Sequence, residues 1–271
     1  MRVAVTGASG LVGRFLTRAL AAAGHRVETL PGWRLGQPAP LEGCEALIHA
    51  ALAHVPGRYR GGEGDDPASF IALNRDGSLH LFEQARAAGV AQVVFLSSRA
   101  VYDALPPGTP LPDGTPPTPH SLYGRIKAET EAGLAALARP GFATASLRAT
   151  GIYGPGEGHK WTGLFADYLA GSPVAPRIGT ELHGDDLAAA ALLILDHGAT
   201  GAFNASDLTL DRHDLLAEIR RLTDCPHPLP DRATTAVSAM SCERLAGLGW
   251  RPGGWPLLRK TLSAMLTSGG F

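Results

Sequence analysis

The chain of 271 residues is 45% hydrophobic and 18% charged, with a formal net charge of −1. This length can bury a large core as one domain or as two closely merged domains, and the balanced charge offers no basic footprint for a nucleic-acid partner. The longest apolar run, Leu187 to Leu195, is half a membrane span, so no membrane association is expected. Three cysteines without metal-ligand spacing, and a first strand with no cleavable leader before it, predict a cytoplasmic protein with no metal site.

The first predicted elements are a strand at Val3–Val5, a tight turn, and a helix whose apolar residues recur at helical spacing from Leu11. Glycines in the turn allow a sharp bend and a close phosphate, and the last of them lets the helix pack against the strand. The free N–H groups and positive dipole end of that helix favour a pyrophosphate, although an ordinary glycine-rich turn is the alternative. The strand–turn–helix context favours a dinucleotide. The residues expected to contact it are Gly7, Ser9, Gly10, Leu11, Val12 and Gly13.

A second strand is predicted between Gly24 and Leu30, and no acidic residue follows it in Pro31-Gly-Trp-Arg34. A dinucleotide fold usually has an Asp or Glu there, which accepts from the adenine ribose hydroxyl. Arg34, or Arg14 in the first helix, could instead meet a 2′-phosphate, which favours NADP over NAD; for Arg34 a solvated loop position is the alternative. The strand at Ala46–Ala50 follows too soon for a crossover helix and a further strand, so the adenine side of the sheet is expected to be short.

Strands and helices alternate through the middle of the chain. Asp66 is expected to cap a helix over residues 67–88, with a proline as its first residue. Gln92–Ser98 is the clearest buried strand, and a helix from Ser121 follows a proline-rich surface loop. This alternation, continued by a strand at Thr144–Arg148, predicts an α/β fold with a doubly wound parallel sheet of Rossmann type.

The rest of the chain carries weaker patterns. A turn is predicted at Gly151–Pro155, and Asp185 or Asp186 is expected to cap an apolar helix at Leu187–Leu195. A strand is predicted at 202–205. Further helices are predicted at 163–170, 212–222 and 257–266.

Three side chains form a candidate catalytic set. Tyr123 and Lys127 lie four residues apart and therefore on one face of their helix, one turn apart. A free tyrosine is a poor base at neutral pH, but a neighbouring ammonium favours the phenolate and makes it a usable proton donor and acceptor. Ser98 ends the buried strand, where ligands sit in open α/β sheets, and can hold and polarise a substrate oxygen. With a dinucleotide, the set predicts a hydride-transfer site.

Several short motifs follow one another along the chain. They are Thr6-Gly-Ala-Ser-Gly-Leu-Val-Gly13, Leu47-Ile-His-Ala-Ala51, Asn74-Arg-Asp-Gly, Phe95-Leu-Ser-Ser-Arg-Ala-Val-Tyr102, Tyr123-Gly-Arg-Ile-Lys127, Leu147-Arg148, Tyr153-Gly-Pro155, His183-Gly-Asp-Asp186 and Leu248-Gly-Trp-Arg-Pro252. In this order they resemble the extended short-chain dehydrogenase/reductase family, the NAD(P)-dependent epimerase/dehydratase group, almost end to end. The resemblance implies Ser98, Tyr123 and Lys127 as the catalytic residues.

The resemblance also implies a small C-terminal substrate-binding domain interleaved with the Rossmann core. The implied core is 1–150, with 175–205 returning to it, and the implied small domain is 151–174 and 206–271. Implied cofactor contacts, beside the turn and the catalytic pair, are His49, Ala50, Ala51, Asn74 and Ser97. Implied substrate contacts are Ala53, Arg99, His159 and Trp161, each with a solvated loop position as the alternative.

The function predicted is that of an NAD(P)-dependent oxidoreductase acting on a carbonyl or secondary alcohol of a sugar-like or small substrate. A nucleotide-sugar epimerase with tightly held NAD is an alternative, although the segment from Pro155 to His183 is short for a nucleotide-sugar pocket. A non-catalytic NADP-sensing protein is another alternative, and the intact Ser98/Tyr123/Lys127 set argues against it. Family members commonly pair through two long helices, so the implied assembly is a homodimer through about 70–88 and 123–138.

Overall fold

A computed structural model describes residues 1–55, 62–156 and 159–267. Its main element is a six-stranded sheet with the strand order β2-β1-β3-β4-β5-β8, in which every neighbouring pair is parallel. The strands are β1 (Arg2–Thr6), β2 (Arg26–Glu28), β3 (Ala46–His49), β4 (Gln92–Ser98), β5 (Ala143–Ala149) and β8 (Gly201–Ala205). The predicted doubly wound α/β fold is therefore confirmed.

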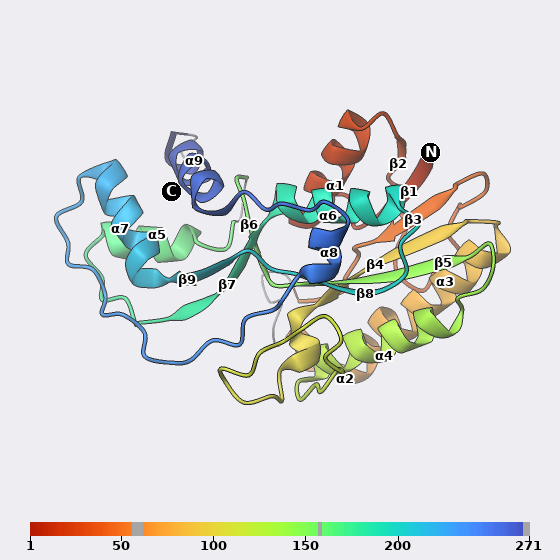
Figure 1. Cartoon of the computed structure of the whole chain (residues 1–271), viewed down its shortest axis with the longest axis horizontal. Helices are drawn as coiled ribbons and strands as arrows, with labels where there is room; N and C mark the ends of the chain where they lie inside the picture. The colour runs from red at the N-terminus through yellow and green to blue at the C-terminus, as the bar shows by residue number, and fades with distance from the viewer. Residues whose placement is uncertain (56–61, 157–158, 268–271) are drawn as a thin grey trace.

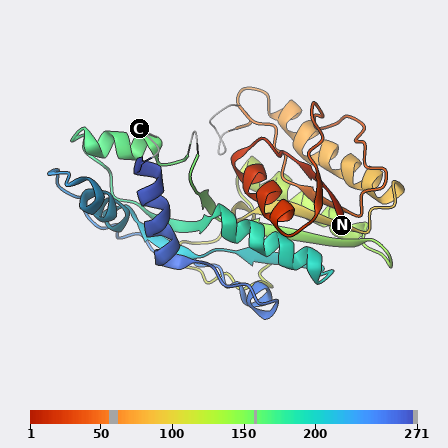
Figure 2. The same ribbon diagram turned by 90° about the horizontal axis from the view of Figure 1, so that it is seen from above.

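Helices cover both faces of this sheet because its strands carry apolar side chains on both sides (Figure 1). On one face α1 (Leu11–Ala22) and α6 (Gly184–Asp196) pack over side chains such as Val3 and Val5. On the other face α3 (Gly77–Ala87) and α4 (Leu122–Ala136) pack over Ala4 and its neighbours. Figure 2 shows the two helical layers from above, with the sheet between them.

The helix predicted at 67–88 is interrupted. It consists of α2 (Pro67–Ile71), a π-helical turn η1 (Ala72–Asp76) and α3. The predicted start is confirmed, because the Asp66 side chain accepts a hydrogen bond from the Ser69 N–H and Pro67 is the first helical residue. Single π-helical turns inside helices are frequent at functional sites. Here the turn contains Asn74.

A second, three-stranded sheet lies at the other end of the molecule (Figure 1). It has the order β6-β7-β9, with β6 (Gly151–Tyr153) parallel to β7 (Ile178–His183) and β7 antiparallel to β9 (Leu208–Asp211). Aromatic and aliphatic residues of this sheet pack with those of the helices α5 (Thr162–Leu169), α7 (Arg212–Thr223) and α9 (Gly254–Thr267). The remaining short helices are η2 (Arg99–Tyr102) and α8 (Glu243–Gly247).

The second strand, predicted between Gly24 and Leu30, is confirmed as the three residues Arg26–Glu28. Two other local predictions are wrong. The turn predicted at Gly151–Pro155 contains strand β6, which pairs with β7. Helix α6 is capped by His183, whose ring accepts from the Asp185 N–H, and not by either aspartate.

Strand β7 belongs to the small sheet, whereas β8 belongs to the large sheet and α6 packs on the large sheet. The chain therefore passes between the two sheets more than once. The implied domain boundaries stay a prediction. In the part of the chain that the structure describes, no helix combines the length and the apolar character that a membrane crossing needs.

Candidate functional site

The glycine turn between β1 and α1 leaves no room for side chains at two of its positions. Gly7 has a φ of +69°, and a Cβ there would lie 2.8 Å from the backbone of Ala50 and Ala51. A Cβ on Gly13 would lie 2.1 Å from the Gly7 carbonyl oxygen. Helix α1 has no side-chain cap and no acidic residue in its first turn, so its N-terminal N–H groups suit an anion. The turn therefore fits the pyrophosphate of a dinucleotide.

A chain of buried hydrogen bonds supports this turn from behind. The Thr6 hydroxyl oxygen accepts from the backbone N–H groups of Ala50 and Ala51, each at 3.2 Å, and its proton is left for His49 Nδ1 at 2.6 Å. The Ser78 hydroxyl donates to the Asn74 carbonyl at 2.7 Å, so it accepts from His49 Nε2–H at 2.8 Å. This network assigns the Nε2–H tautomer to His49.

His49 therefore has a supporting position. Burial lowers its pKa to about 3, and the charge on Lys127 adds to the effect, so the ring is neutral. Both ring nitrogens are used within the protein. A cofactor contact by residue 49 stays a prediction, and the ring itself is not free to make it.

Asn74 fixes the loop after β3. Its side chain accepts from the Ala53 N–H at 2.7 Å and donates to the Ala53 carbonyl at 2.8 Å, in the manner of a paired strand. It also donates to the Phe70 carbonyl at 2.9 Å, across the π-helical turn. The loop containing Ala51 and Ala53 is thereby held against the glycine turn, which brings the predicted cofactor and substrate positions together.

Ser98 and the Lys127 ammonium both lie at the carboxyl end of β4. The Lys127 ammonium donates to the Leu96 carbonyl at 2.8 Å and lies 5.8 Å from the centroid of the Tyr123 ring. The Ser98 hydroxyl oxygen accepts from the Ala100 N–H at 3.1 Å, which leaves its proton for another acceptor. These residues come from two elements, β4 and α4, which pack against each other. The structure thus places a hydroxyl donor and a lysine–tyrosine pair at one edge of the sheet.

The electrostatics of Lys127 suit a proton relay. Burial lowers the pKa of its ammonium to about 8, and the Glu131 carboxylate one turn further along α4 opposes that shift. A lysine that titrates near neutral pH can respond to a proton moving on a neighbouring phenol.

Ser97, the other predicted hydroxyl, faces the opposite side of β4. It is buried and donates to the Glu131 carboxylate. Its predicted contact with the cofactor is untested, and its observed partner lies inside the protein.

The two arginines considered for a 2′-phosphate are both exposed. Arg34 lies in the loop after β2, and its backbone N–H donates to the Gln37 side chain at 3.3 Å. The Arg14 guanidinium lies close to Gly156, where a Cβ would be 3.2 Å from it. Glu28, the acid that ends β2, is engaged by Arg2 at 2.9 Å and by Arg26 at 3.1 Å.

The predicted substrate contacts lie in different surroundings. Arg99 donates to the Ser238 carbonyl at 2.8 Å, which ties the end of β4 to the C-terminal segment. His159 and Trp161 are each only 6% exposed and pack against α5 and the small sheet, where Trp161 stacks on Tyr153 at 5.0 Å between ring centroids. Contact with a substrate stays a prediction for all of these residues.

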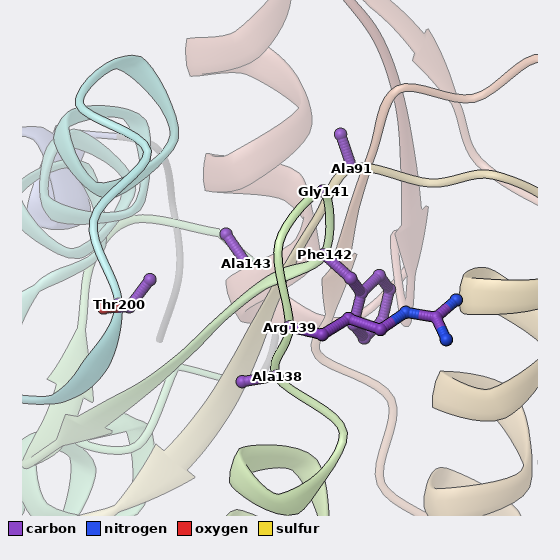
Figure 3. A pocket seen from close by; sticks show the side chains of 7 residues that line it. All are labelled: Ala91, Ala138, Arg139, Gly141, Phe142, Ala143 and Thr200. Atoms are coloured by element: carbon purple, nitrogen blue, oxygen red, sulfur yellow. The ribbon is translucent and has the colours of Figure 1, made fainter.

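A shallow hollow of about 450 Å³ lies at the opposite edge of the sheet (Figure 3). It is lined by Ala91, Ala138, Arg139, Gly141, Phe142, Ala143 and Thr200. These positions adjoin the amino ends of β4 and β5, whereas ligands of open α/β sheets bind at the carboxyl ends. The candidate active site is therefore the carboxyl edge with Ser98, and not this hollow.

Comparison with known proteins identifies the family. The sequence model described as the NAD dependent epimerase/dehydratase family matches residues 38–206, more than half of the chain. The chain belongs to this family. It is accordingly an NAD(P)-dependent enzyme of the oxidoreductase class, as predicted.

Several known proteins are similar to nearly the whole chain. A Streptomyces protein named 3-diazoavenalumate denitrifying reductase is 29% identical over 93% of this chain and 96% of its own. The structure of RMD from Pseudomonas aeruginosa complexed with NADPH has a TM-score of 0.80 at 24% identity, covering 98% of this chain and 96% of that one. A short-chain dehydrogenase/reductase superfamily protein from Agrobacterium tumefaciens with bound NAD has a TM-score of 0.82 at 23% identity, covering 99% and 97%.

Three supporting residues carry no sequence pattern that marks them as functional. Thr6, Ser78 and Glu131 hold the predicted site residues in place, but each sits in a motif or helix face that is equally typical of ordinary core packing. The spacing of Glu131, four residues after Lys127, was the one available signal.

Proposed function

We propose that the protein transfers a hydride at the carbonyl or secondary alcohol carbon of a sugar-like or small substrate, with Ser98, Tyr123 and Lys127 as its catalytic residues. The observation that carries the proposal is the placement of the Lys127 ammonium, which is bound to the Leu96 carbonyl at the end of β4 and lies beside the Tyr123 ring. The bound nicotinamide would supply or accept the hydride.

Together the three side chains bind the substrate oxygen and supply its proton. In the direction of reduction, the Ser98 hydroxyl donates a hydrogen bond to the substrate oxygen and holds it in place. Tyr123 then gives its phenolic proton to that oxygen as negative charge develops there. Lys127 stabilises the phenolate that remains, because its positive charge lies next to the ring.

We further propose that NADP is the preferred coenzyme and that Arg34 binds its 2′-phosphate. Arg34→Ala should then weaken NADPH binding about tenfold or more and leave NADH binding nearly unchanged, because only NADPH carries the 2′-phosphate. Fluorescence titration of both nucleotides measures this. Arg139→Ala, at the opposite edge of the sheet, is the matched control. Equal losses for both nucleotides would refute the role of Arg34.

The nucleotide content of freshly purified protein separates the main proposal from the epimerase alternative. Protein that is empty and then oxidises added NADPH with aldehydes or ketones supports a reductase with a dissociating coenzyme. Stoichiometric NAD(H), released on denaturation, supports an epimerase that recycles its coenzyme in each turnover and contradicts the preference for NADP.

A further inference from the structure

Helix α4 carries a third functional position on the face of its catalytic pair. Tyr123, Lys127 and Glu131 follow one another at four-residue intervals, so their side chains line one side of the helix. Lys127 and Glu131 are 6% and 7% exposed. A buried carboxylate therefore lies one turn behind the lysine, on the side away from the tyrosine.

The Glu131 carboxylate joins α4 to two strands. It accepts from Arg148 Nε at 3.0 Å and from Arg148 Nη2 at 2.6 Å, and it also accepts from the Ser97 hydroxyl. Ser97 and Arg148 are opposite each other in the register of β4 and β5. One side chain thus fixes both strands at the residue immediately before Ser98.

The contacts continue through the sheet. Arg148 Nη1 donates to the Tyr102 hydroxyl at 2.6 Å, and that hydroxyl donates to the Asn204 side chain at 2.9 Å. Asn204 belongs to β8, and its amide donates to the Leu111 carbonyl at 3.0 Å. Removal of Glu131 or Arg148 alone would leave the other charge buried without its partner, so the two side chains hold each other in place.

From this arrangement we infer that Glu131 is a positioning residue for the proposed hydride-transfer site. It holds the ends of β4 and β5 against α4, and its negative charge keeps Lys127 protonated beside Tyr123. The inference rests on the proposed function only for its consequence in catalysis, since the protonation of Lys127 can be observed without turnover.

The surroundings of Lys127 support this role. Burial lowers the pKa of Lys127 to about 8, and Glu131 is the charged group that raises it. Among the residues that the structure describes, the neutral ring of His49 on β3 and Tyr123 on its own helix also face Lys127, and Arg148 on β5 lies beyond Glu131. Glu131→Gln would remove the negative charge and leave Arg148 positive, so the pKa of Lys127 should fall further.

The experiment is an NMR titration of protein labelled with 13C at the lysine ε-carbons. The chain has only three lysines, Lys127, Lys160 and Lys260, so the Lys127 signal is assigned by its loss in Lys127→Met. Its midpoint should lie near pH 8 in the wild-type protein. In Glu131→Gln the midpoint should fall by about one pH unit or more.

Two single variants serve as controls. Glu129→Gln removes a carboxylate from the same helix, but one that is half exposed and paired with Arg75 at 3.0 Å, so the Lys127 midpoint should stay as in the wild type. Glu131→Asp keeps the charge and shortens the side chain, so it should retain most of the wild-type midpoint. If Glu131→Gln leaves the midpoint unchanged, or if Glu131→Asp lowers it equally, the charge of Glu131 has no such role.

A double variant covers the case in which Glu131→Gln does not fold. Replacement of both Glu131 and Arg148 by Met removes the whole ion pair, and apolar replacements of buried pairs commonly keep proteins folded. The Lys127 midpoint should still fall, though by less, because the opposing charge of Arg148 has gone as well. A wild-type midpoint there would overturn the inference. Absence of turnover in the wild-type protein would instead count against the proposed function and leave the titration result standing.

Discussion

Ser97 and Ser98, adjacent at the end of β4, have different hydrogen-bonding roles. The Ser97 hydroxyl points into the protein and donates to the Glu131 carboxylate. The Ser98 hydroxyl accepts from the Ala100 N–H, so its own proton can be donated to a ligand. The alternation of side chains along a strand produces this difference, because successive residues face opposite sides of the sheet. A hydroxyl with a free proton is what an oxygen anchor requires.

Tyr123→Phe tests the proton carrier at the same scale. Turnover should fall by about 10²- to 10⁴-fold, because that is the usual contribution of a general acid or base, while coenzyme binding should stay within about twofold. Steady-state kinetics with a carbonyl substrate and nucleotide titration measure the two quantities. Tyr168→Phe is the control, since it removes a tyrosine hydroxyl in α5 that donates to the His227 carbonyl. Unchanged turnover in Tyr123→Phe would refute the mechanism.

At the scale of elements, the sequence predicted the strands and helices whose apolar residues recur with a clear period. The large sheet and its covering helices follow from apolar runs such as Gln92–Ser98, because a strand buried on both faces has few alternative structures. The small sheet could not be predicted from such apolar runs. Gly151–Tyr153 lies among glycines and a proline, and Ile178–His183 mixes apolar, polar and charged residues, so neither resembles a strand until its partner is known. Pairing that depends on distant segments leaves little local signal.

The same distinction applies to the site. Ser98, Tyr123 and Lys127 can be proposed as a catalytic set from the sequence, because their chemistry and spacing are unusual together, and their role stays a prediction. The neutral ring of His49 could not be assigned, because its tautomer depends on Thr6 and Ser78, which are distant in the sequence. The role of Asn74 likewise depends on a π-helical turn, for which the sequence carries no pattern.

Substitutions in the glycine turn separate its two tasks. Gly13→Ala should destabilise the protein by a few degrees in Tm or more, because its Cβ would overlap the Gly7 carbonyl oxygen. Gly10→Ala should fold normally, since its φ is −73° and a Cβ there would be 3.4 Å from the nearest atom outside its chain neighbours. It should still weaken dinucleotide binding, because the added methyl group stands at the N-terminus of α1. Thermal unfolding and nucleotide titration measure both effects; full binding by Gly10→Ala would place the pyrophosphate elsewhere.

On the scale of the whole molecule, Asp186 at the start of α6 binds the segment that leads into α9. Asp186 in α6 accepts from the Gly253 N–H at 3.0 Å with its side chain, and its carbonyl accepts from the Trp250 indole at 2.9 Å. Burial raises the pKa of this carboxyl to about 6, and the neighbouring Asp207 and Asp185 charges add to the rise. The folded protein therefore binds this proton more tightly than the unfolded chain does.

The stability should accordingly depend on pH. Between about pH 4 and pH 6 the folded state holds more protons at Asp186 than the unfolded state, so the free energy of unfolding should decrease as the pH rises, by up to about 3 kcal/mol from this group. Asp186→Asn should lack this decrease. Asp185→Asn, whose side chain is half exposed, should keep it. Urea unfolding at several pH values is the measurement, and an equal slope in wild type and Asp186→Asn would contradict the assignment.

The order of the strands also governs how the chain folds while it is being synthesised. Strand β5 pairs with β8, yet β6, α5, β7 and α6 are made between them. In a growing chain the edge of β5 stays unpaired until residue 205 has emerged, and β7 waits for β9 in the same way. An unpaired strand edge is a template for association with other chains. The ribosome-bound protein therefore exposes this edge of β5, the neighbour of the strand that ends in Ser98, while residues 150–205 are being made, and a chaperone that covers such edges would act during that interval.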